Sequence, residues 1–311
     1  MNSSKIVIPN NHGEKLVGVL HETGSREVVV MCHGCRSNKN TPVIEKLASA
    51  IEKEGISAFR FDFSGNGESD GTFNYGNYKQ EADGDLRSVI QYFHNTNRVV
   101  PIILGHSKGG NAVLRYASMF HDSIRGVINL SGCYDLERCH HLDDPEFVEK
   151  LKRQGFVNVK VKNSSRKYRI TQESLDERFS IDMNQTCLRI SKGCKVLTVH
   201  GSDDDAVPVE EAKEFAKIIP NHKLEILQGA DHSFSQHRSL LASTVIEFIK
   251  SIHILTFSYF PVCSDPIPRR EIRRCTILLG IIFDSDRLSC NMNRMIVGAS
   301  NGGLILELLK E

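Results

Sequence analysis

A regular alternation of strand-like and helix-like segments over about the first 250 residues limits the fold most strongly. Short β-branched runs such as 27–34 (EVVVMCHG), which ends at a glycine, are typical of strands buried on both faces. The segment 41–55 (TPVIEKLASAIEKEG) has apolar residues at helical spacing, a proline in its first turn and a terminal glycine. This alternation predicts an α/β fold with a mostly parallel sheet covered by helices on both sides.

Two stretches depart from this alternation. Residues 134–191 are charged and contain only short alternating pieces, which favours a cap inserted after a strand end. Residues 253–311 are apolar but poorly patterned, and they hold three of the nine cysteines. We therefore expect one domain over residues 1–252, with a cap at about 134–191, followed by a carboxyl-terminal extension over 253–311.

Charge and cysteine usage limit the partners and the compartment. The formal net charge is +1, so there is no electrostatic field that would hold nucleic acid or an anionic membrane. The odd number of scattered cysteines favours free thiols in a reducing compartment. Residues 1–15 lack the apolar core of a signal peptide, and no run reaches the ~18 apolar residues of a membrane span. We expect a cytoplasmic protein with no membrane span and no nucleic-acid partner.

The segment GHSKGG, residues 105–110, fits the pattern Gly-x-Ser-x-Gly and lies between an apolar run and a helix-like run. This arrangement is typical of a serine nucleophile on a strand-to-helix turn, the nucleophile elbow, although a structural glycine turn has the same letters. A second match, GASNG at 298–302, also follows an apolar run. The local sequence therefore does not separate Ser107 from Ser300.

Distant residues do separate the two serines. A serine hydroxyl needs a base within hydrogen-bond distance and a carboxylate that orients the base, in the chain order Ser, acid, His for this kind of turn. No histidine follows Ser300. After Ser107, an acidic run at 203–205 follows one strand-like segment and His232 follows the next. Because the carboxyl ends of parallel strands meet at one edge of a sheet, we predict that these loops converge on Ser107.

An acyl-transfer site also needs two backbone N–H donors for the oxyanion of the tetrahedral intermediate. One donor would be the amide of Lys108, directly after the serine, and the other the amide of Cys35, in the loop after the strand-like run 27–34. Two cationic side chains near that loop, Arg36 and Lys39, could meet an anionic acyl group, although a solvated loop is the ordinary interpretation.

Two weaker patterns suggest other chemistry. Cys32-x-x-Cys35 has the spacing of a redox pair, but it overlaps the expected oxyanion loop, which favours coincidence. The adjacent residues Cys139, His140 and His141 could bind zinc, but no second ligand pair stands at a suitable spacing, which favours a polar segment of the cap. No metal or organic cofactor is expected.

Taken together, five segments resemble the α/β-hydrolase superfamily in the family's order: HGC (33–35), DFSGNGES (62–69), GHSKGG (105–110), HGSDDDAVPV (200–209) and GADHSF (229–234). The pattern is most similar to small-capped serine esterases of the cinnamoyl and feruloyl esterase type and to serine-aminopeptidase-like hydrolases. The resemblance implies the α/β-hydrolase fold and a catalytic triad with Ser107 as nucleophile and His232 as general base. Since the family's acid usually stands three residues before a Val-Pro pair, it also implies Asp204, with Asp203 and Asp205 left open.

The activity that this resemblance implies is that of a serine carboxylesterase, which cleaves esters of small molecules through an acyl-enzyme on Ser107. Several alternatives stay open. One is an amidase, an aminopeptidase-like enzyme or an acylglycerol hydrolase of the same fold. Another is a small-molecule receptor that keeps the triad without turnover. A third is an inactive interaction protein that binds a protein partner through residues 253–311.

Overall fold

The computed structural model describes residues 2–120, 124–138, 144–160 and 167–253, together with the backbone of 295–300 and 303–308. The chain divides into two compact units, Met1–Ile252 and His253–Glu311. Among the described residues, none of the helices has the length and apolar character that crossing a membrane requires.

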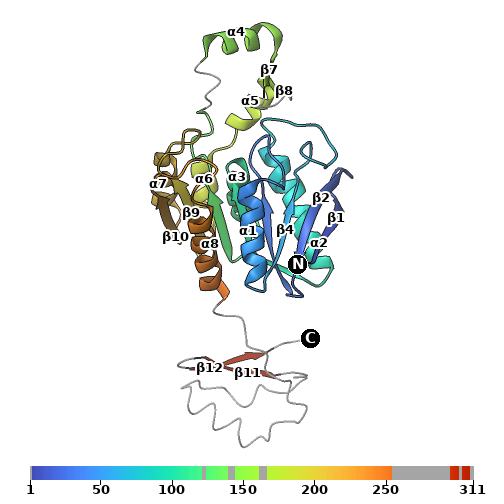
Figure 1. Cartoon of the computed structure of the whole chain (residues 1–311), viewed down its shortest axis with the longest axis vertical. Helices are drawn as coiled ribbons and strands as arrows, with labels where there is room; N and C mark the ends of the chain where they lie inside the picture. The colour runs from blue at the N-terminus through green and yellow to red at the C-terminus, as the bar shows by residue number, and fades with distance from the viewer. Residues whose placement is uncertain are drawn as a thin grey trace, which may run out of the picture. The chain divides into compact units, whose positions relative to one another are not determined.

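The larger unit is built on one eight-stranded sheet with the order β1-β2-β4-β3-β5-β6-β9-β10 (Figure 1). The pairs β1–β2 and β2–β4 are antiparallel, and all the other neighbours are parallel. The strands are β1 Asn2–Pro9, β2 Lys15–Glu22, β3 Glu27–Cys32, β4 Ser57–Phe61, β5 Val99–His106, β6 Gly126–Leu130, β9 Lys195–Gly201 and β10 His222–Leu227. The predicted mostly parallel sheet is confirmed.

Helices cover both faces of this sheet, as the alternation predicts. Including α4 and α5, which lie beyond one end of the sheet, the described helices are α1 Pro42–Lys53, the π-helix η1 Gln80–Leu86, α2 Arg87–Asn95, α3 Lys108–Met119, α4 Pro145–Gln154, α5 Gln172–Phe179, α6 Met183–Leu188, α7 Val209–Ile218 and α8 Arg238–His253. Strand β3 shows how the layers form: Val29 and Met31 pack with residues of α1 and α8, while Val28 and Val30 pack with residues of η1, α2 and α3. All four side chains are fully buried, which explains the unbroken β-branched run.

Residues 80–95 begin with a π-helical turn, η1, and then continue as α2. This wider turn places Glu81 and Asp85 among the buried residues. Such turns occur frequently at functional sites.

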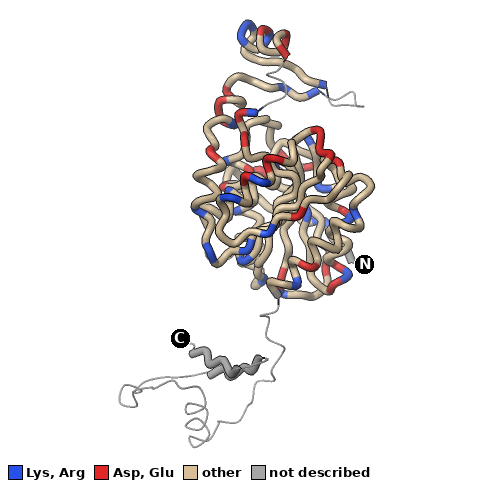
Figure 2. Tube along the Cα trace, turned by 90° about the vertical axis from the view of Figure 1, so that its left-hand side faces the viewer, with Lys and Arg blue, Asp and Glu red and all other residues tan. Residues whose placement is uncertain are grey.

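The segment between β6 and α6 contains α4, the antiparallel pair β7 Phe156–Lys160 and β8 Lys167–Thr171, and α5. It has a small apolar core of its own, which includes Phe147 and Tyr168 and packs against Phe73 and Tyr75 of the loop after β4. Figure 1 shows this segment beyond one end of the sheet, and Figure 2 shows that charges of both signs are interspersed along the larger unit.

The smaller unit contains an antiparallel hairpin of β11 Met295–Ser300 and β12 Gly303–Leu308. Ser300 is the last residue of β11 and pairs with Gly303. The second Gly-x-Ser-x-Gly match therefore lies at a hairpin end, and not on a strand-to-helix turn.

Candidate active site

Ser107 lies between the end of β5 and the start of α3, with φ 55° and ψ −122°. Positive φ is uncommon for a residue with a Cβ atom, and strained backbone of this kind concentrates at functional sites. Two glycines make the turn possible. A Cβ atom on Gly105 would lie 2.0 Å from the Gly109 carbonyl oxygen, and one on Gly109 would lie 2.5 Å from the His33 oxygen.

His232 and Asp204 form a direct pair on the loops after β10 and β9. His232 Nδ1 lies 2.8 Å from Asp204 Oδ2, while Asp204 Oδ1 accepts hydrogen bonds from the amides of Ala206 and Val207. The Asp204 side chain is fully buried, whereas the His232 side chain is 19% exposed. The pair therefore has a fixed carboxylate behind a histidine that reaches the pocket.

The neighbouring aspartates do not share this position. Asp203 and Asp205 are exposed, and Asp203 accepts a hydrogen bond from Ser202. In the part of the chain that the structure describes, neither is paired with His232. Of the three candidates, the structure brings only Asp204 to the histidine.

A second histidine, His200, supports the same carboxylate from the buried side. Its Nε2 lies 3.2 Å from Asp204 Oδ2 and 2.8 Å from the Val207 carbonyl oxygen. Burial alone would raise the pKa of Asp204, but the hydrogen bonds with His200, His232 and the Val207 amide outweigh it and hold the pKa well below its usual range. Asp204 therefore stays ionised and can orient the imidazole of His232.

His106 holds the backbone of His232. Its Nε2 lies 2.8 Å from the His232 carbonyl oxygen, so this nitrogen carries the proton and donates. Burial, followed by the nearby charge of His232, lowers the pKa of His106 to about 4, and the ring is neutral at pH 7. His106 occupies the variable position before the serine in GHSKGG. The motif therefore includes this residue, but the sequence does not indicate its contact with His232.

The predicted oxyanion residues lie around the same pocket, which has a volume of about 420 Å³. Its lining includes Gly34, Cys35, Ser107, Lys108 and His232. The loop that carries Cys35 is held by His33, whose Nδ1 donates to the Gly34 oxygen at 2.7 Å and whose Nε2 accepts from the Phe63 amide. Burial lowers the pKa of His33 to about 4, which keeps this tautomer neutral.

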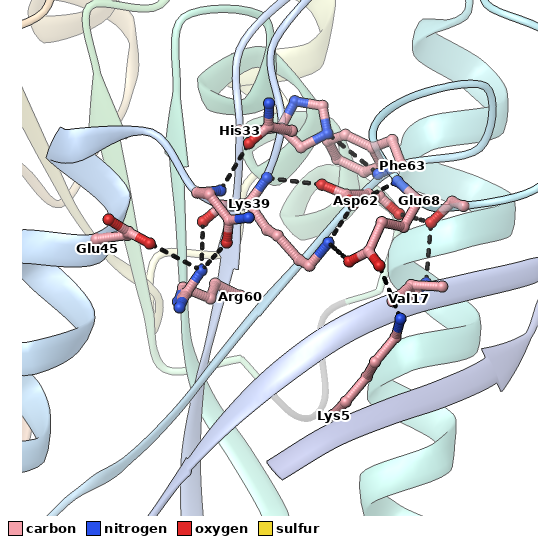
Figure 3. A network of polar contacts seen from close by, with 12 residues as sticks. Lys5, Val17, His33, Lys39, Glu45, Arg60, Asp62, Phe63 and Glu68 are labelled. Atoms are coloured by element: carbon pink, nitrogen blue, oxygen red, sulfur yellow. Dashed lines mark hydrogen bonds and ion pairs between the residues drawn. The ribbon is translucent and has the colours of Figure 1, made fainter. Parts of the chain in front are cut away.

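Lys39 does not line this pocket, and the expectation of a solvated side chain there is wrong. Its Nζ lies 2.6 Å from both Asp62 Oδ2 and Glu68 Oε2, and its amide donates to Asp62 Oδ1 (Figure 3). The Lys39 side chain is only 3% exposed. The ion pair ties the loop that carries Cys35 to the DFSGNGES turn. Gly67 in this turn has φ 55°, and a Cβ atom there would lie 2.2 Å from Asp62 Oδ2, so the position requires glycine.

A second buried ion pair, which the sequence does not reveal, lies beside the serine turn. Lys108 Nζ is 2.9 Å from Glu81 Oε1, and both side chains are buried. The same nitrogen lies 4.8 Å from the centre of the Tyr78 ring. Burial raises the pKa of Glu81 to about 7, against the opposing effect of Lys108. The π-helical turn positions Glu81, and no motif in the sequence signals such a turn.

The thiols give no support to redox chemistry. Cys32 and Cys35 are both free, and burial raises the pKa of each, so the reactive thiolate is disfavoured. The candidate zinc ligands at 139–141 lie outside the described residues. Within the described ranges, no group of three or more His, Cys, Asp or Glu side chains is placed to hold a metal ion.

A mostly parallel sheet with a strained serine turn defines a hydrolase of the α/β-hydrolase fold. Residues 23–187 match the family described as serine aminopeptidase, S33. Since this match spans more than half of the 311 residues, the chain belongs to that family. The predicted resemblance and fold class are thereby confirmed.

The relatives are distant, but they cover most of the chain. Protein YDL057W of Saccharomyces cerevisiae is 25% identical over 235 residues, which are 67% of this chain and 69% of that protein. The mitochondrial palmitoyl-protein thioesterase ABHD10 of Rattus norvegicus is 22% identical and covers 75% of this chain and 78% of its own. The structure of Est1E from Butyrivibrio proteoclasticus with ferulic acid bound superposes with a TM-score of 0.66 at 23% identity, over 79% of this chain and 98% of Est1E.

Proposed function

We propose that this protein is a serine hydrolase that cleaves carboxylic esters of small molecules through an acyl-enzyme on Ser107. The observation that carries the proposal is the 2.8 Å contact between His232 Nδ1 and buried Asp204, on loops that reach the pocket of Ser107. Because Nδ1 donates to Asp204, Nε2 of His232 is left to accept the proton of the serine hydroxyl.

The steps follow from these roles. Ser107 Oγ attacks the ester carbonyl carbon while His232 takes the hydroxyl proton. The amides of Cys35 and Lys108 donate to the oxyanion of the tetrahedral intermediate. Collapse of this intermediate breaks the bond to the alcohol, which leaves with the proton from His232. A water molecule then gives a proton to His232, attacks the acyl-enzyme and releases the acid, and Ser107 recovers its proton.

The cap is the part of the proposed domain, residues 1–252, that would select the substrate. Arg138 and Arg178 line the pocket from the proposed cap at 134–191, and Cys133, directly before the cap, lines it as well. Fold alone does not determine substrate in this class of protein, so the shape and charge of this lining carry the selectivity.

The pocket favours esters over the amino-terminal residues of peptides. An aminopeptidase has to bind an α-ammonium group, which requires carboxylates or carbonyl oxygens near the nucleophile. None of the described residues that line this pocket is Asp or Glu, whereas five of them are Arg or Lys. The rat relative is a thioesterase, and thioesters would react by the same acyl-enzyme steps.

Labelling with a fluorophosphonate, followed by peptide mass spectrometry, tests the proposal. We expect label on the peptide that contains residues 105–110, and none there in the Ser107→Ala variant. Ser300→Ala serves as the matched control and should label like the wild type. Label on Ser300, or no label on a folded sample, would overturn the proposal. A ligand-induced rise in melting temperature without turnover would then support the receptor function.

A further inference from the structure

We propose that the pocket beside Ser107 selects esters that carry an oxyanion group, a carboxylate or a phosphate, on their acyl or alcohol part. This inference rests on the proposed ester hydrolysis and names its substrate class. It comes from the charge of the pocket lining, which differs from that of the protein as a whole.

Five residues with cationic side chains line the pocket: Arg36, Lys108, Arg138, Arg178 and Arg238. No acidic side chain is among the described lining residues. The whole chain, in contrast, has 39 Lys and Arg against 38 Asp and Glu, and both signs are interspersed along the larger unit (Figure 2). The lining is therefore a local excess of positive charge and does not follow from the overall composition.

Carboxylates outside the pocket compensate part of this charge, and one of them, Asp231, interacts electrostatically with Arg238. Glu81 pairs with Lys108 at 2.9 Å, and Glu211 lies 3.8 Å from Arg138, whose side chain is 57% exposed. Arg36 instead donates to the hydroxyl group of Tyr168 and lies 4.5 Å from the centre of that ring. Nε of Arg238 is buried without a hydrogen-bond partner among the described residues.

Arg178 is the most buried of the arginines, with 8% of its surface exposed. Its Nε donates to the Leu136 oxygen at 2.7 Å, and its Nη atoms donate to the Tyr78 hydroxyl and the Arg138 oxygen. These contacts hold the planar guanidinium in one orientation at the pocket wall. A guanidinium that is already held in one orientation suits the oxygens of a carboxylate or phosphate, because little side-chain freedom is lost when they bind.

Two of the five cationic residues are chain neighbours of residues in the proposed reaction. Arg36 directly follows Cys35, and Lys108 directly follows Ser107. An anionic group held by this lining would thus fix the substrate near the nucleophile, and the positive field would also raise the rate of encounter with anions. The competing explanation is that the charges stabilise only the oxyanion of the intermediate, which would accelerate charged and neutral esters alike.

Two matched ester pairs distinguish these explanations with the full-length protein. For the acyl side, we would compare mono-4-nitrophenyl adipate with its neutral methyl ester. For the alcohol side, we would compare 4-(butyryloxy)phenylacetate with its methyl ester. We expect kcat/KM to be about 10- to 100-fold higher for the charged member of at least one pair, mainly through KM, as for a hydrogen bond to a charged group.

Variants of the pocket residues then test whether these residues cause the preference for the charged ester. Arg178→Met and Arg238→Gln should each lower the charged-to-neutral ratio of kcat/KM, and Arg178→Lys should retain part of it. If Arg178→Met does not fold, Arg238→Gln still tests the proposal. Arg169→Gln is the matched control, because Arg169 is an exposed cation of β8 outside the pocket lining, and it should leave the ratio unchanged.

Competitive inhibition separates the two oxyanions. Stronger inhibition by phenylacetate supports a carboxylate-bearing substrate, and stronger inhibition by phenylphosphonate supports a phosphate-bearing one. Equal kcat/KM within both ester pairs would overturn the charge selection and leave the proposed hydrolysis intact. Failure to hydrolyse any ester, together with no fluorophosphonate label, would overturn the proposed function itself.

Discussion

Two stretches of this chain have the same five-residue pattern but different surroundings. Ser107 lies where β5 turns into α3, with φ 55°, and it lines a pocket with His232. Ser300 ends β11 and pairs with Gly303 in an antiparallel hairpin. The comparison teaches that the pattern specifies a turn only where the flanking strand and helix demand it.

The glycines of the two stretches explain this difference. Gly105 and Gly109 are required because backbone atoms of the crossing strand and helix occupy the space of their missing side chains. Gly298 lies in the antiparallel ladder of β11 and β12, opposite Ile305. The strand-to-helix turn at Ser107 and the hairpin at Ser300 are therefore different backbone settings for the same pattern.

The sharpest test of this comparison replaces each serine in turn. Ser107→Ala should lower kcat/KM for a 4-nitrophenyl ester by a factor on the order of 10⁴ or more, because no nucleophile remains. Ser300→Ala should leave the rate unchanged. Steady-state kinetics measure both, and comparable losses in the two variants would remove the distinction.

Asp204 provides the second test, since its pairing with His232 distinguishes the Ser107 region. Asp204→Asn should lower kcat by about 10³- to 10⁴-fold, because the amide no longer stabilises the imidazolium and permits the wrong tautomer. Asp203→Asn and Asp205→Asn are matched controls of the same chemistry on exposed neighbours. A greater loss from either control would move the acid to that residue.

The buried ion pair of Lys39 and Asp62, next to the proposed oxyanion loop, gives a third test, which concerns stability. Lys39→Met leaves the fully buried Asp62 without its cation, and we expect the free energy of unfolding to fall by about 3 kcal/mol. Lys5→Met removes the exposed partner of Glu68 and should have almost no effect. Urea denaturation measures both changes. An equal effect of the two substitutions would contradict a supporting role for the buried pair.

The last test concerns the stability of the fold in acid. Burial lowers the pKa values of His33, His106 and His222 to about 4, so each stays neutral in the folded state while the unfolded chain takes up protons below about 6.5. The unfolded state therefore binds more protons, and stability falls as pH decreases from 6.5 to 4. Glu81, with its pKa raised to about 7, acts in the opposite sense: its contribution falls as pH rises from 4.5 to 7.

Thermal unfolding at several pH values checks this expectation. His222→Gln removes one titrating ring that lies away from the pocket, where it contacts Thr198 at 2.8 Å, and should make the acid-side loss shallower. An unchanged slope in this variant would mean that His222 does not contribute to the loss.

Much of the framework could be predicted from local sequence patterns. The alternation predicted the mostly parallel sheet, and GHSKGG predicted a strand-to-helix turn at Ser107, because strand, turn and helix signals are short in range. The family resemblance implied Asp204, from its place before Val207-Pro208, and the structure places its carboxylate against His232. The catalytic roles of these residues stay predictions until labelling and kinetics test them.

Only the tertiary structure decided what surrounds the turn. The sequence around Lys39 does not show whether its side chain is solvated or buried against Asp62. The hydrogen bond from Arg36 to Tyr168 joins residues that are 132 positions apart in the sequence. The pair of Glu81 and Lys108 depends on a π-helical turn that no motif signals. Periodicity and turn chemistry are properties of neighbours in the chain, so the sequence alone determined the framework and the order of the candidate residues. Burial and charge are set by distant segments that meet on folding, and these contacts decided the electrostatics of the pocket.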